Sequence, residues 1–453
     1  MKQLNFLSTI AVTKPRRLFV CMLVSGASAA FAMGNQSEDQ HHKAGGSITT
    51  TLELPHGTPE EVGMSGERLN KVKDVVQEFI DEGRIQGAVV CVARRGKVVY
   101  FEAQGVSNQK NPAPMPADAM FHMASSTKPI LGVAAMMMIE EGLFKPSDPV
   151  EKYIPEFKNI KVAVLKDPVG EDSSDAKSKD NSVSKSKFMS KKTPNYRLVD
   201  PHRPITIHDL LTHTSGIAGG KGLGEAKKKR QKQSNDTLAT RIARVAEGPL
   251  DFQPGTRWGY GGGLDVVARV IEIVSGMPFN EFVQERIFDP LDMKDTHWIV
   301  PKDKLDRMLF VVKGKAGWPT TYFSGSAGLI STARDYLHFE QMLLNKGELF
   351  GNRILKPESV EMMSSSQVGD LYADSAKGGA GLAFGYTVAI TVDPSLTKTG
   401  RSTGAFGWGG AAGTVSWTDP KQELVGVIMV QQPTADLPVR IAEAIGAAID
   451  DWR

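Results

Sequence analysis

A serine and a lysine three residues apart could form a nucleophile and its base. Ser125 and Lys128 lie within the stretch FHMASSTKPILGVAAMMMIEEGL, which spans residues 121–143. Three residues make nearly one helical turn, so both side chains leave the same face and the ammonium can reach the hydroxyl. A lysine whose pKa is lowered by burial can accept the proton of a serine that attacks a carbonyl carbon. The pair therefore indicates acyl-transfer chemistry, although an N-cap serine followed by a solvated lysine has the same spacing.

The helix that must hold this pair is strongly apolar. Ser-Ser-Thr at 125–127 is a start signal, Ala, Val, Met and Ile fill the following turns, and Gly142 predicts the end. We therefore expect a buried helix. The free backbone N–H groups at its start could help to hold an oxyanion.

A glycine-rich loop offers another titratable side chain. The stretch PGTRWGYGGG at 254–263 precedes an amphipathic helix predicted for 264–274. Three consecutive glycines let the backbone pass close to a bound group, and Tyr260 is the titratable side chain at the turn. The loop lacks the Gly-Lys-Ser/Thr ending of a phosphate cradle. A packed loop aromatic is the alternative role for Tyr260.

Two further side chains, His213 and Ser326, are candidates for a catalytic role, but their surroundings in the sequence argue against it. His213 ends a short helix predicted within PITIHDLLTHTSGI at 204–217, but no nucleophile pairs with it, so we expect its side chain to bond backbone. Ser326 misses the Gly-x-Ser-x-Gly elbow because Ser324 replaces the first glycine. We expect Ser326 in a tight turn that positions a helix starting near Thr332.

Strand patterns gather near the two ends of the chain. Five segments have them: 87–93 and 97–104, joined as a hairpin after a helix capped by Ser65, then 384–392, 413–417 and 424–431, before a closing helix at 438–452. With helices between and after them, these strands predict a mixed α/β protein of the α+β type. Its central antiparallel sheet is built from both chain ends, and the helical middle is an inserted subdomain.

The first 32 residues have the features of an export signal. Four basic residues precede an apolar run at 18–24, and Ala30-Phe31-Ala32 is a suitable cleavage site. The pair Arg16-Arg17 resembles a twin-arginine signal. An uncleaved anchor is the alternative, but the run is short for a bilayer span. We expect a periplasmic or secreted protein.

The mature chain is expected to contain a flexible polar tail at 33–57 and a catalytic domain at 58–453. Within that domain, residues 166–193 are rich in Asp, Ser and Lys and predict a disordered insertion. His41 and His42 lie in the polar tail and do not indicate a metal site. No cofactor is expected, and no other segment approaches a transmembrane run.

Charge and cysteine content exclude further classes. The whole chain carries a net charge of +3, and removing a signal with four positive and no acidic residues leaves −1. Near-neutrality gives no reason to expect nucleic acid as a partner. Cys91 is the one cysteine outside the signal, so a disulfide framework is impossible.

Five short motifs, in their order along the chain, resemble those of the serine β-lactamase and penicillin-binding protein superfamily. The chain is most similar to the esterases related to class C β-lactamases, from about Pro59 to the C-terminus, apart from 166–193 and the loop near 220–236. The motifs are Ser125-x-x-Lys128, THTSG at 212–216, PGTRWGY ending in Tyr260, SAGLISTARD at 326–335, and Trp408-Gly409-Gly410 before WTDP at 417–420.

The resemblance implies a β-lactamase/transpeptidase-like fold and an acyl-Ser125 intermediate, with Lys128 and Tyr260 sharing the base and acid roles. It also implies an oxyanion hole made by the N–H groups of Ser125 and Ala411, on the strand entered by Trp408. Substrate would lie along this strand, against Trp408, Gly409 and Gly410. A tyrosine beside an ammonium has its phenolate favoured, so the two can relay one proton.

Departures from the β-lactamase pattern favour an esterase. Gly262 stands where β-lactamases have the Asn of Tyr-x-Asn, and Trp408-Gly409-Gly410 replaces Lys-Thr-Gly or His-x-Gly. A literal Lys398-Thr399-Gly400 lies too far upstream, so we expect it in a loop. The resemblance thus implies a carboxylesterase for small-molecule esters. The alternatives are β-lactamase or D-Ala-D-Ala carboxypeptidase-type activity, or a catalytically silent protein that binds cell-wall peptide.

Overall fold

The computed structural model describes residues 52–108, 112–165, 196–217, 233–309, 320–397 and 399–452. They belong to one compact unit that spans 51–453. The predicted signal, most of the predicted tail and the predicted insertion at 166–193 lie outside the described residues. Among the described helices, none is long and apolar enough to cross a membrane.

The end of the predicted tail is an exception, because residues 52–57 dock on the folded unit. Leu54 is 6% exposed and belongs to the main core. The Gly57 N–H donates to the Val98 carbonyl oxygen (3.0 Å), and the Val98 N–H donates to that of Pro55 (2.8 Å). The buried leucine and the two backbone hydrogen bonds fix residues 52–57 on the folded unit. The prediction of a flexible tail is therefore corrected for these residues.

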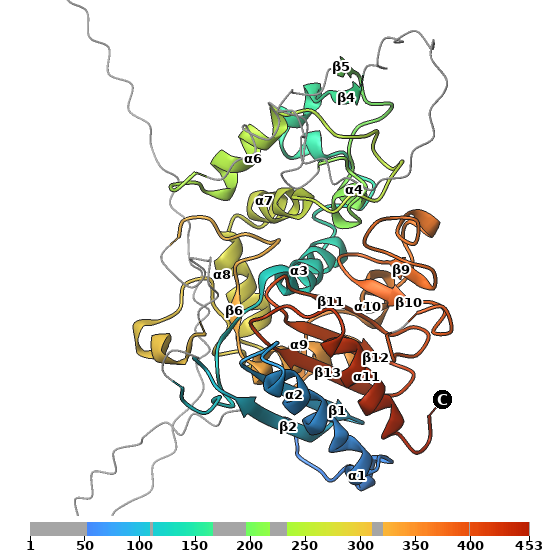
Figure 1. Cartoon of the computed structure of the whole chain (residues 1–453). Helices are drawn as coiled ribbons and strands as arrows, with labels where there is room; N and C mark the ends of the chain where they lie inside the picture. The colour runs from blue at the N-terminus through green and yellow to red at the C-terminus, as the bar shows by residue number, and fades with distance from the viewer. Residues whose placement is uncertain are drawn as a thin grey trace, which may run out of the picture. The chain divides into compact units, whose positions relative to one another are not determined.

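A seven-stranded antiparallel sheet forms the centre of the unit (Figure 1). The strand order is β2-β1-β13-β12-β11-β10-β9, so the first hairpin pairs with the last strand, as Val89 opposite Met429 shows. The strands are β1 (Gly87–Arg94), β2 (Lys97–Gly105), β9 (Leu382–Phe384), β10 (Ala389–Thr391), β11 (Phe406–Gly409), β12 (Val415–Asp419) and β13 (Leu424–Met429). The predicted antiparallel sheet from both chain ends is confirmed.

The strand pattern alone gave five strands rather than seven. The segment predicted as one strand at 384–392 folds into β9 and β10, because Thr387 adopts a positive φ of 69° and the Gly385 N–H donates to the Val388 carbonyl oxygen (2.9 Å). The other addition is β11, whose glycines hide the usual strand signal.

Helices cover both faces of the sheet, and β1 is buried on each side (Figure 1). Its residues alternate between two cores, with Val90 packed against α2 and α11 and Cys91 in the main core with α3 and α9. The covering helices are α1 (Gly66–Leu69), α2 (Lys71–Asp81) and α11 (Leu437–Ala447) on one face, with α9 (Ala333–Leu344) on the other. Ser65 caps α1 as predicted, since its side chain accepts from the Arg68 N–H (3.3 Å).

The predicted buried helix is α3 (Lys128–Glu140), which follows a 3₁₀ turn, η2 (Ala124–Thr127). Every residue from Lys128 to Met138 is buried, as an all-apolar helix requires. Figure 1 shows α3 between the sheet and the helices α4, α6 and α7 of the inserted subdomain. The site residues therefore lie where the subdomain meets the sheet.

The remaining elements complete the two parts. The helices are α4 (Ile207–Leu211), α6 (Leu238–Ala246), α7 (Gly263–Ser275), α8 (Phe279–Val283), the π-helical turn η5 (Gln284–Phe288) and α10 (Pro357–Met363). The 3₁₀ turns are η1 (Glu60–Val62), η3 (Val150–Lys152), η4 (Pro155–Asn159), η6 (Lys302–Arg307) and η7 (Gly369–Leu371). The short strand pairs are β3 (Phe121–His122) with β6 (Ile330–Ser331), β4 (Val162–Leu165) with β5 (Tyr196–Val199), and β7 (Glu348–Leu349) with β8 (Asn352–Arg353).

Candidate active site

Ser125 lies on a tightly held turn. The preceding Ala124 has a φ of +45°, in the left-handed region that costs a non-glycine residue free energy. The next residue is fixed on two sides, because the Tyr336 hydroxyl donates to the Ser126 carbonyl oxygen (2.7 Å) and Thr414 Oγ1 lies 3.0 Å from Ser126 Oγ. These contacts hold Ser125, which is partly exposed, in one orientation.

Lys128 is buried in the first turn of α3, with 3% of its surface exposed. Its ammonium donates to Ser125 Oγ (3.0 Å) and to the Ser326 carbonyl oxygen (2.6 Å). No carboxylate lies within salt-bridge distance of it in the described part of the chain. The lysine is therefore aimed at the serine hydroxyl by neutral partners alone.

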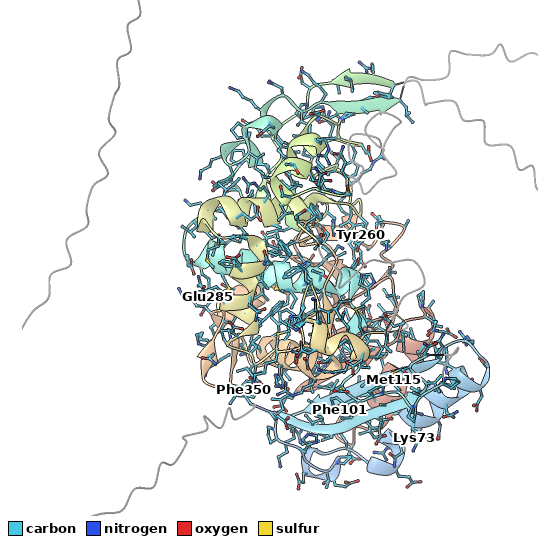
Figure 2. The ribbon with its side chains drawn as sticks, turned by 90° about the vertical axis from the view of Figure 1, so that its left-hand side faces the viewer. Lys73, Phe101, Met115, Tyr260, Glu285 and Phe350 are labelled. Atoms are coloured by element: carbon cyan, nitrogen blue, oxygen red, sulfur yellow. The ribbon has the colours of Figure 1, made fainter. Side chains whose placement is uncertain are left out.

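Tyr260 reaches the same oxygen from the glycine-rich loop, with its hydroxyl donating to Ser125 Oγ (2.6 Å). Burial alone would raise the pKa of the Tyr260 phenol, but the charge of Lys128 and hydrogen bonds with Lys128 and Ser125 outweigh burial and lower that pKa. Figure 2 places Tyr260 between the upper helices and the part of the sheet that carries Phe101. The structure thus brings Ser125, Lys128 and Tyr260 together around one atom.

Trp408 forms a wall of the site from β11. Its ring lies 5.9 Å from the Tyr260 ring and 5.4 Å from the Phe384 ring, measured between centroids. The backbone after it approaches the Ser125 turn so closely that a Cβ at Gly410 would lie 2.2 Å from the Met123 carbonyl oxygen. Glycine at 410 is therefore required for β11 to end beside the nucleophile.

Ala411 lies in the turn between β11 and β12 rather than on the strand, which corrects the sequence prediction. The Gly413 N–H donates to the Gly410 carbonyl oxygen (2.9 Å), which closes this turn. Among the described residues, the N–H groups of Ser125 and Ala411 have no hydrogen-bond acceptor. Both donors are thus free to bind an oxyanion.

Asp265 supports the site from α7, and sequence reasoning missed it. Its carboxylate is 6% exposed and accepts from Ser324 Oγ (2.8 Å), from the Ser326 N–H (2.9 Å) and from the Tyr322 hydroxyl. The carbonyl group of Ser326 in turn accepts from Lys128. Asp265 therefore fixes the turn that orients the lysine. An acidic residue on the buried face of an amphipathic helix was the signal available.

Ser326 lies in a turn before α9, as predicted, and contacts Lys128 through its backbone. The helix begins after Thr332, whose side chain accepts from the Asp335 N–H (3.2 Å). The hydroxyl of Ser326 is buried and has no partner among the described residues. In the described ranges, no base therefore contacts this hydroxyl.

The backbone hydrogen bond predicted for the His213 side chain is not found among the described residues. Its Nε2 is buried without a hydrogen-bond partner in the described part of the chain, while the ring packs 4.8 Å from the Tyr260 ring. Burial, followed by the charges of Lys128 and Lys377, holds the pKa of His213 well below its usual value. His213 is a neutral ring that supports Tyr260, because an aromatic cluster surrounds it.

The upstream Lys-Thr-Gly sequence and Gly262 lie in different parts of the structure. Thr399 and Gly400 lie in the loop between β10 and β11, as expected, with Gly400 against the backbone of α11, while Lys398 is outside the described residues. Gly262 adjoins the site as the N-cap of α7, with a φ of −84°. No atom lies within 4 Å of a Cβ added there, so a side chain would fit.

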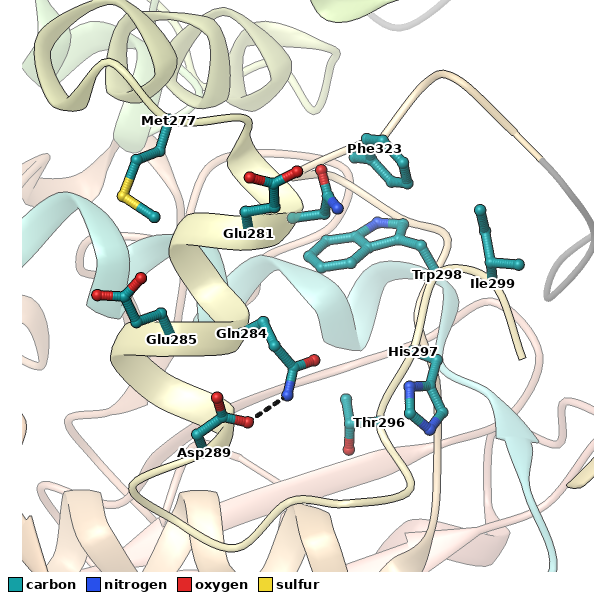
Figure 3. A pocket seen from close by; sticks show the side chains of 11 residues that line it. Met277, Glu281, Gln284, Glu285, Asp289, Thr296, His297, Trp298, Ile299 and Phe323 are labelled. Atoms are coloured by element: carbon teal, nitrogen blue, oxygen red, sulfur yellow. Dashed lines mark hydrogen bonds between the residues drawn. The ribbon is translucent and has the colours of Figure 1, made fainter. Parts of the chain in front are cut away.

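A separate cavity of about 470 Å³ lies between the α8–η5 helix and residues 296–299 (Figure 3). Glu281, Glu285 and Asp289 line its helical side, opposite Trp298. None of the three residues around Ser125 Oγ lines it. Among the described residues, no three His, Cys, Asp or Glu side chains form a group that could hold a metal ion.

Comparisons with known proteins identify the family and relatives along most of the chain. The model of the family described as Beta-lactamase matches residues 72–448. Esterase EstB of Burkholderia gladioli is 28% identical over 379 residues, which cover 76% of this chain and 85% of EstB. Lovastatin esterase of Penicillium rubens is 31% identical over 405 residues, which cover 80% of this chain and 92% of that protein.

A solved structure extends the agreement to the fold. EstCE1, a hydrolase with promiscuous acyltransferase activity, superposes with a TM-score of 0.67 and 25% identity, covering 84% of this chain and 99% of EstCE1. The predicted β-lactamase/transpeptidase-like fold is therefore confirmed. The chain belongs to the beta-lactamase family, and it is a serine hydrolase.

Proposed function

We propose that the protein is an exported carboxylesterase that hydrolyses small esters through an acyl-Ser125 intermediate. The observation that carries this proposal is the double hydrogen bond at Ser125 Oγ, from Tyr260 (2.6 Å) and from Lys128 (3.0 Å). The names of two relatives, esterase EstB and lovastatin esterase, support an ester as substrate.

In acylation, Ser125 Oγ attacks the ester carbonyl carbon while its proton passes into the Tyr260–Lys128 pair. A Tyr260 phenolate can accept this proton, and the lowered pKa of Tyr260 favours that form. The N–H groups of Ser125 and Ala411 stabilise the negative carbonyl oxygen. The carbon–oxygen bond to the alcohol then breaks, and the pair returns the proton to the alcohol oxygen.

Deacylation repeats these steps with water as nucleophile. Water loses a proton to the Tyr260–Lys128 pair and attacks the acyl carbon, and Ser125 Oγ takes the proton back as it leaves. The carboxylic acid is released and the free serine is restored. The protons and bonds of both steps are thus accounted for by Ser125, Lys128, Tyr260, the ester and water.

Gly262 favours esters over β-lactams. An asparagine there could hydrogen-bond the side-chain amide of a β-lactam, whereas glycine leaves that amide unpaired, a loss of about 1–3 kcal/mol if the amide is desolvated. A compact ester needs no such partner and gains apolar contact with the Trp408 ring. We therefore expect the protein to hydrolyse β-lactams much more slowly than small esters.

The test compares kcat/KM for 4-nitrophenyl butyrate and for a chromogenic cephalosporin. We expect the ester to be preferred by at least about 100-fold, and Gly262→Asn to shift the ratio towards the cephalosporin. The variant is suited to this test because position 262 has a φ of −84° and open space around it. Comparable values for both substrates would place the protein on the β-lactamase side of the family.

A fluorophosphonate probe separates the enzyme from a catalytically silent wall-binding protein. An active serine reacts covalently with this probe, whereas a protein that only binds cell-wall peptide stays unlabelled. Release of D-alanine from a peptide ending in D-Ala-D-Ala, in the absence of esterase activity, would favour the carboxypeptidase alternative.

A further inference from the structure

A second ammonium group lies beside Tyr260. Lys377 Nζ is 4.4 Å from the centre of the Tyr260 ring, and Lys128 Nζ is 4.8 Å from it. The hydroxyl of the same ring donates to Ser125 Oγ, so Lys377 and the nucleophile contact the same tyrosine. Lys377 is exposed and belongs to the segment between η7 and β9.

The backbone of Lys377 is anchored, whereas its ammonium makes no hydrogen bond to the described residues and contacts the Tyr260 ring. The Tyr372 hydroxyl donates to the Lys377 carbonyl oxygen (3.3 Å), and the Tyr372 ring packs 4.9 Å from the Trp258 ring in the aromatic cluster behind Tyr260. The Lys377 N–H donates to Ser375 Oγ (3.4 Å). The ammonium is thus held near the site by a fixed backbone, with a flexible stem that lets it move.

Both lysines at the site lack an acidic partner among the residues that the structure describes. In the described ranges, no carboxylate lies within salt-bridge distance of Lys128 or Lys377. His213 is held neutral beside them, so it does not change the balance of charge. The site therefore has a positive potential, which attracts an anionic group.

We propose that Lys377 binds a carboxylate or another anionic group of the substrate, so that the preferred substrates are esters bearing a negative charge. This inference rests on the proposed esterase function. A lysine ammonium offers three donors and a full charge, which the uncharged Trp408 wall on β11 does not supply. The same ammonium would also attract the carboxylate of a cephalosporin, so poor β-lactam turnover must come from Gly262.

The anionic group can belong to either part of the ester, and matched substrates distinguish the two. Mono-4-nitrophenyl glutarate carries the carboxylate on the acyl part, and its methyl ester is the neutral equivalent. The compound 3-(butanoyloxy)benzoate carries it on the alcohol part, again with its methyl ester as the neutral equivalent. The measured quantity is the ratio of kcat/KM for the charged substrate to that for the neutral one.

For at least one of the two substrate pairs, we expect this ratio to fall about tenfold in Lys377→Ala. The fall corresponds to the loss of one charge-assisted contact. Lys377→Glu should lower the ratio further, and added salt should lower it in the wild type but not in Lys377→Ala. The control is Lys71→Ala, which removes another exposed lysine, on α2, and should leave the ratio unchanged.

A fall for the glutarate pair assigns Lys377 to the acyl side, and a fall for the benzoate pair assigns it to the alcohol side. Equal ratios in the wild type and in Lys377→Ala for both pairs, with all esters still hydrolysed, would overturn the role of Lys377 alone. Absence of turnover and of an acyl-enzyme with any of these esters would overturn the proposed function itself.

Discussion

Lys128 and Tyr260 meet at the same oxygen atom, so we predict that they act as one unit. Replacing either residue, by Lys128→Ala or Tyr260→Phe, should lower kcat/KM for 4-nitrophenyl butyrate by about 10³-fold or more. The double variant should be little worse than the poorer single variant, because the two residues pass one proton. Additive losses in free energy would show that they perform separate tasks.

Asp265 acts on the reaction through Ser326 and Lys128, so it is a positioning residue. Asp265→Ala frees the turn that carries the Ser326 carbonyl oxygen, and a misplaced lysine should lower kcat about 100-fold with a smaller change in KM. The pH profile of kcat should also change, because the charge of Lys128 lowers the pKa of Tyr260 and a displaced lysine lowers it less. A purely structural role would lower the yield of folded protein and leave both kcat and this profile unchanged.

The control for Asp265 is Asp289→Ala. Asp289 is an exposed carboxylate that accepts a hydrogen bond from Gln284 Nε2 (2.5 Å) in the separate cavity of Figure 3. The substitution Asp289→Ala removes the same type of side chain from a helical segment that does not contact Lys128. We expect its kcat to equal that of the wild type.

Residue spacing predicted the contacts made within one helical turn, and motif order predicted Tyr260. Ser125 and Lys128 are paired by the geometry of a helix start, which a sequence displays directly. Lys377 was missed because it reaches Tyr260 from a segment without a recognisable motif. Asp265 was missed because its partners, Ser324 and Ser326, lie about 60 residues further along the chain, so spacing does not reveal the contact. The aromatic cluster around His213 was not foreseen, because its rings come together only in the folded chain.

At the scale of elements, α9 is tied to β12 by a buried carboxyl group. Glu340 on α9 is 1% exposed and accepts from Ser416 Oγ (2.6 Å) and Thr418 Oγ1 (2.7 Å). Burial raises the pKa of Glu340 to about 7, although the hydrogen bonds from Ser416 and Thr418 oppose this rise. The group therefore titrates near neutral pH in the folded protein.

This raised pKa predicts a pH dependence of stability. A glutamate in the unfolded chain has a pKa of about 4.3, so between that pH and about 7 the folded protein binds more protons than the unfolded one. The contribution of Glu340 to stability is thus present below pH 4.3 and lost as the pH rises to 7.

Glu340→Gln removes this titration and should flatten the fall in Tm between pH 5 and pH 7.5. The exposed Glu156→Gln is the control and should follow the wild type. Parallel Tm curves for Glu340→Gln and the wild type would show that Glu340 is ionised throughout this range. Differential scanning fluorimetry at fixed ionic strength measures all three proteins.

Helices were easier to predict than strands. Ser65, Thr332 and the glycine after α3 mark helix ends by caps that act locally. In contrast, β9 and β10 have three residues each, which is too few for alternation to be recognised, and their pairing depends on the neighbouring β11.

At the scale of the whole molecule, the fold joins the two ends of the chain in one sheet. The pairing of β1 with β13 requires the C-terminal segment before the sheet is complete. The sequence indicated this arrangement because strand patterns are concentrated at both ends. The docking of residues 52–57 was not foreseen, because a single leucine in a polar segment has no period.

We predict that the whole chain is exported and cleaved after Ala32. Mass spectrometry of the protein from a periplasmic or culture-medium fraction should then find Met33 at the N-terminus. Arg16→Lys combined with Arg17→Lys should stop export if the twin-arginine route is used. An uncleaved chain that starts at Met1 and stays in the cytoplasm would contradict this prediction.

The most direct test of the account is the identity of the acylated residue. After reaction with a fluorophosphonate probe or a slowly hydrolysed ester, intact mass should show one adduct, and peptide mapping should place it on Ser125. Ser125→Ala should remain folded, since it loses one partly exposed hydroxyl, and should give no adduct. An adduct that persists in Ser125→Ala, or one found on Ser326 in the wild type, would contradict Ser125 as the nucleophile.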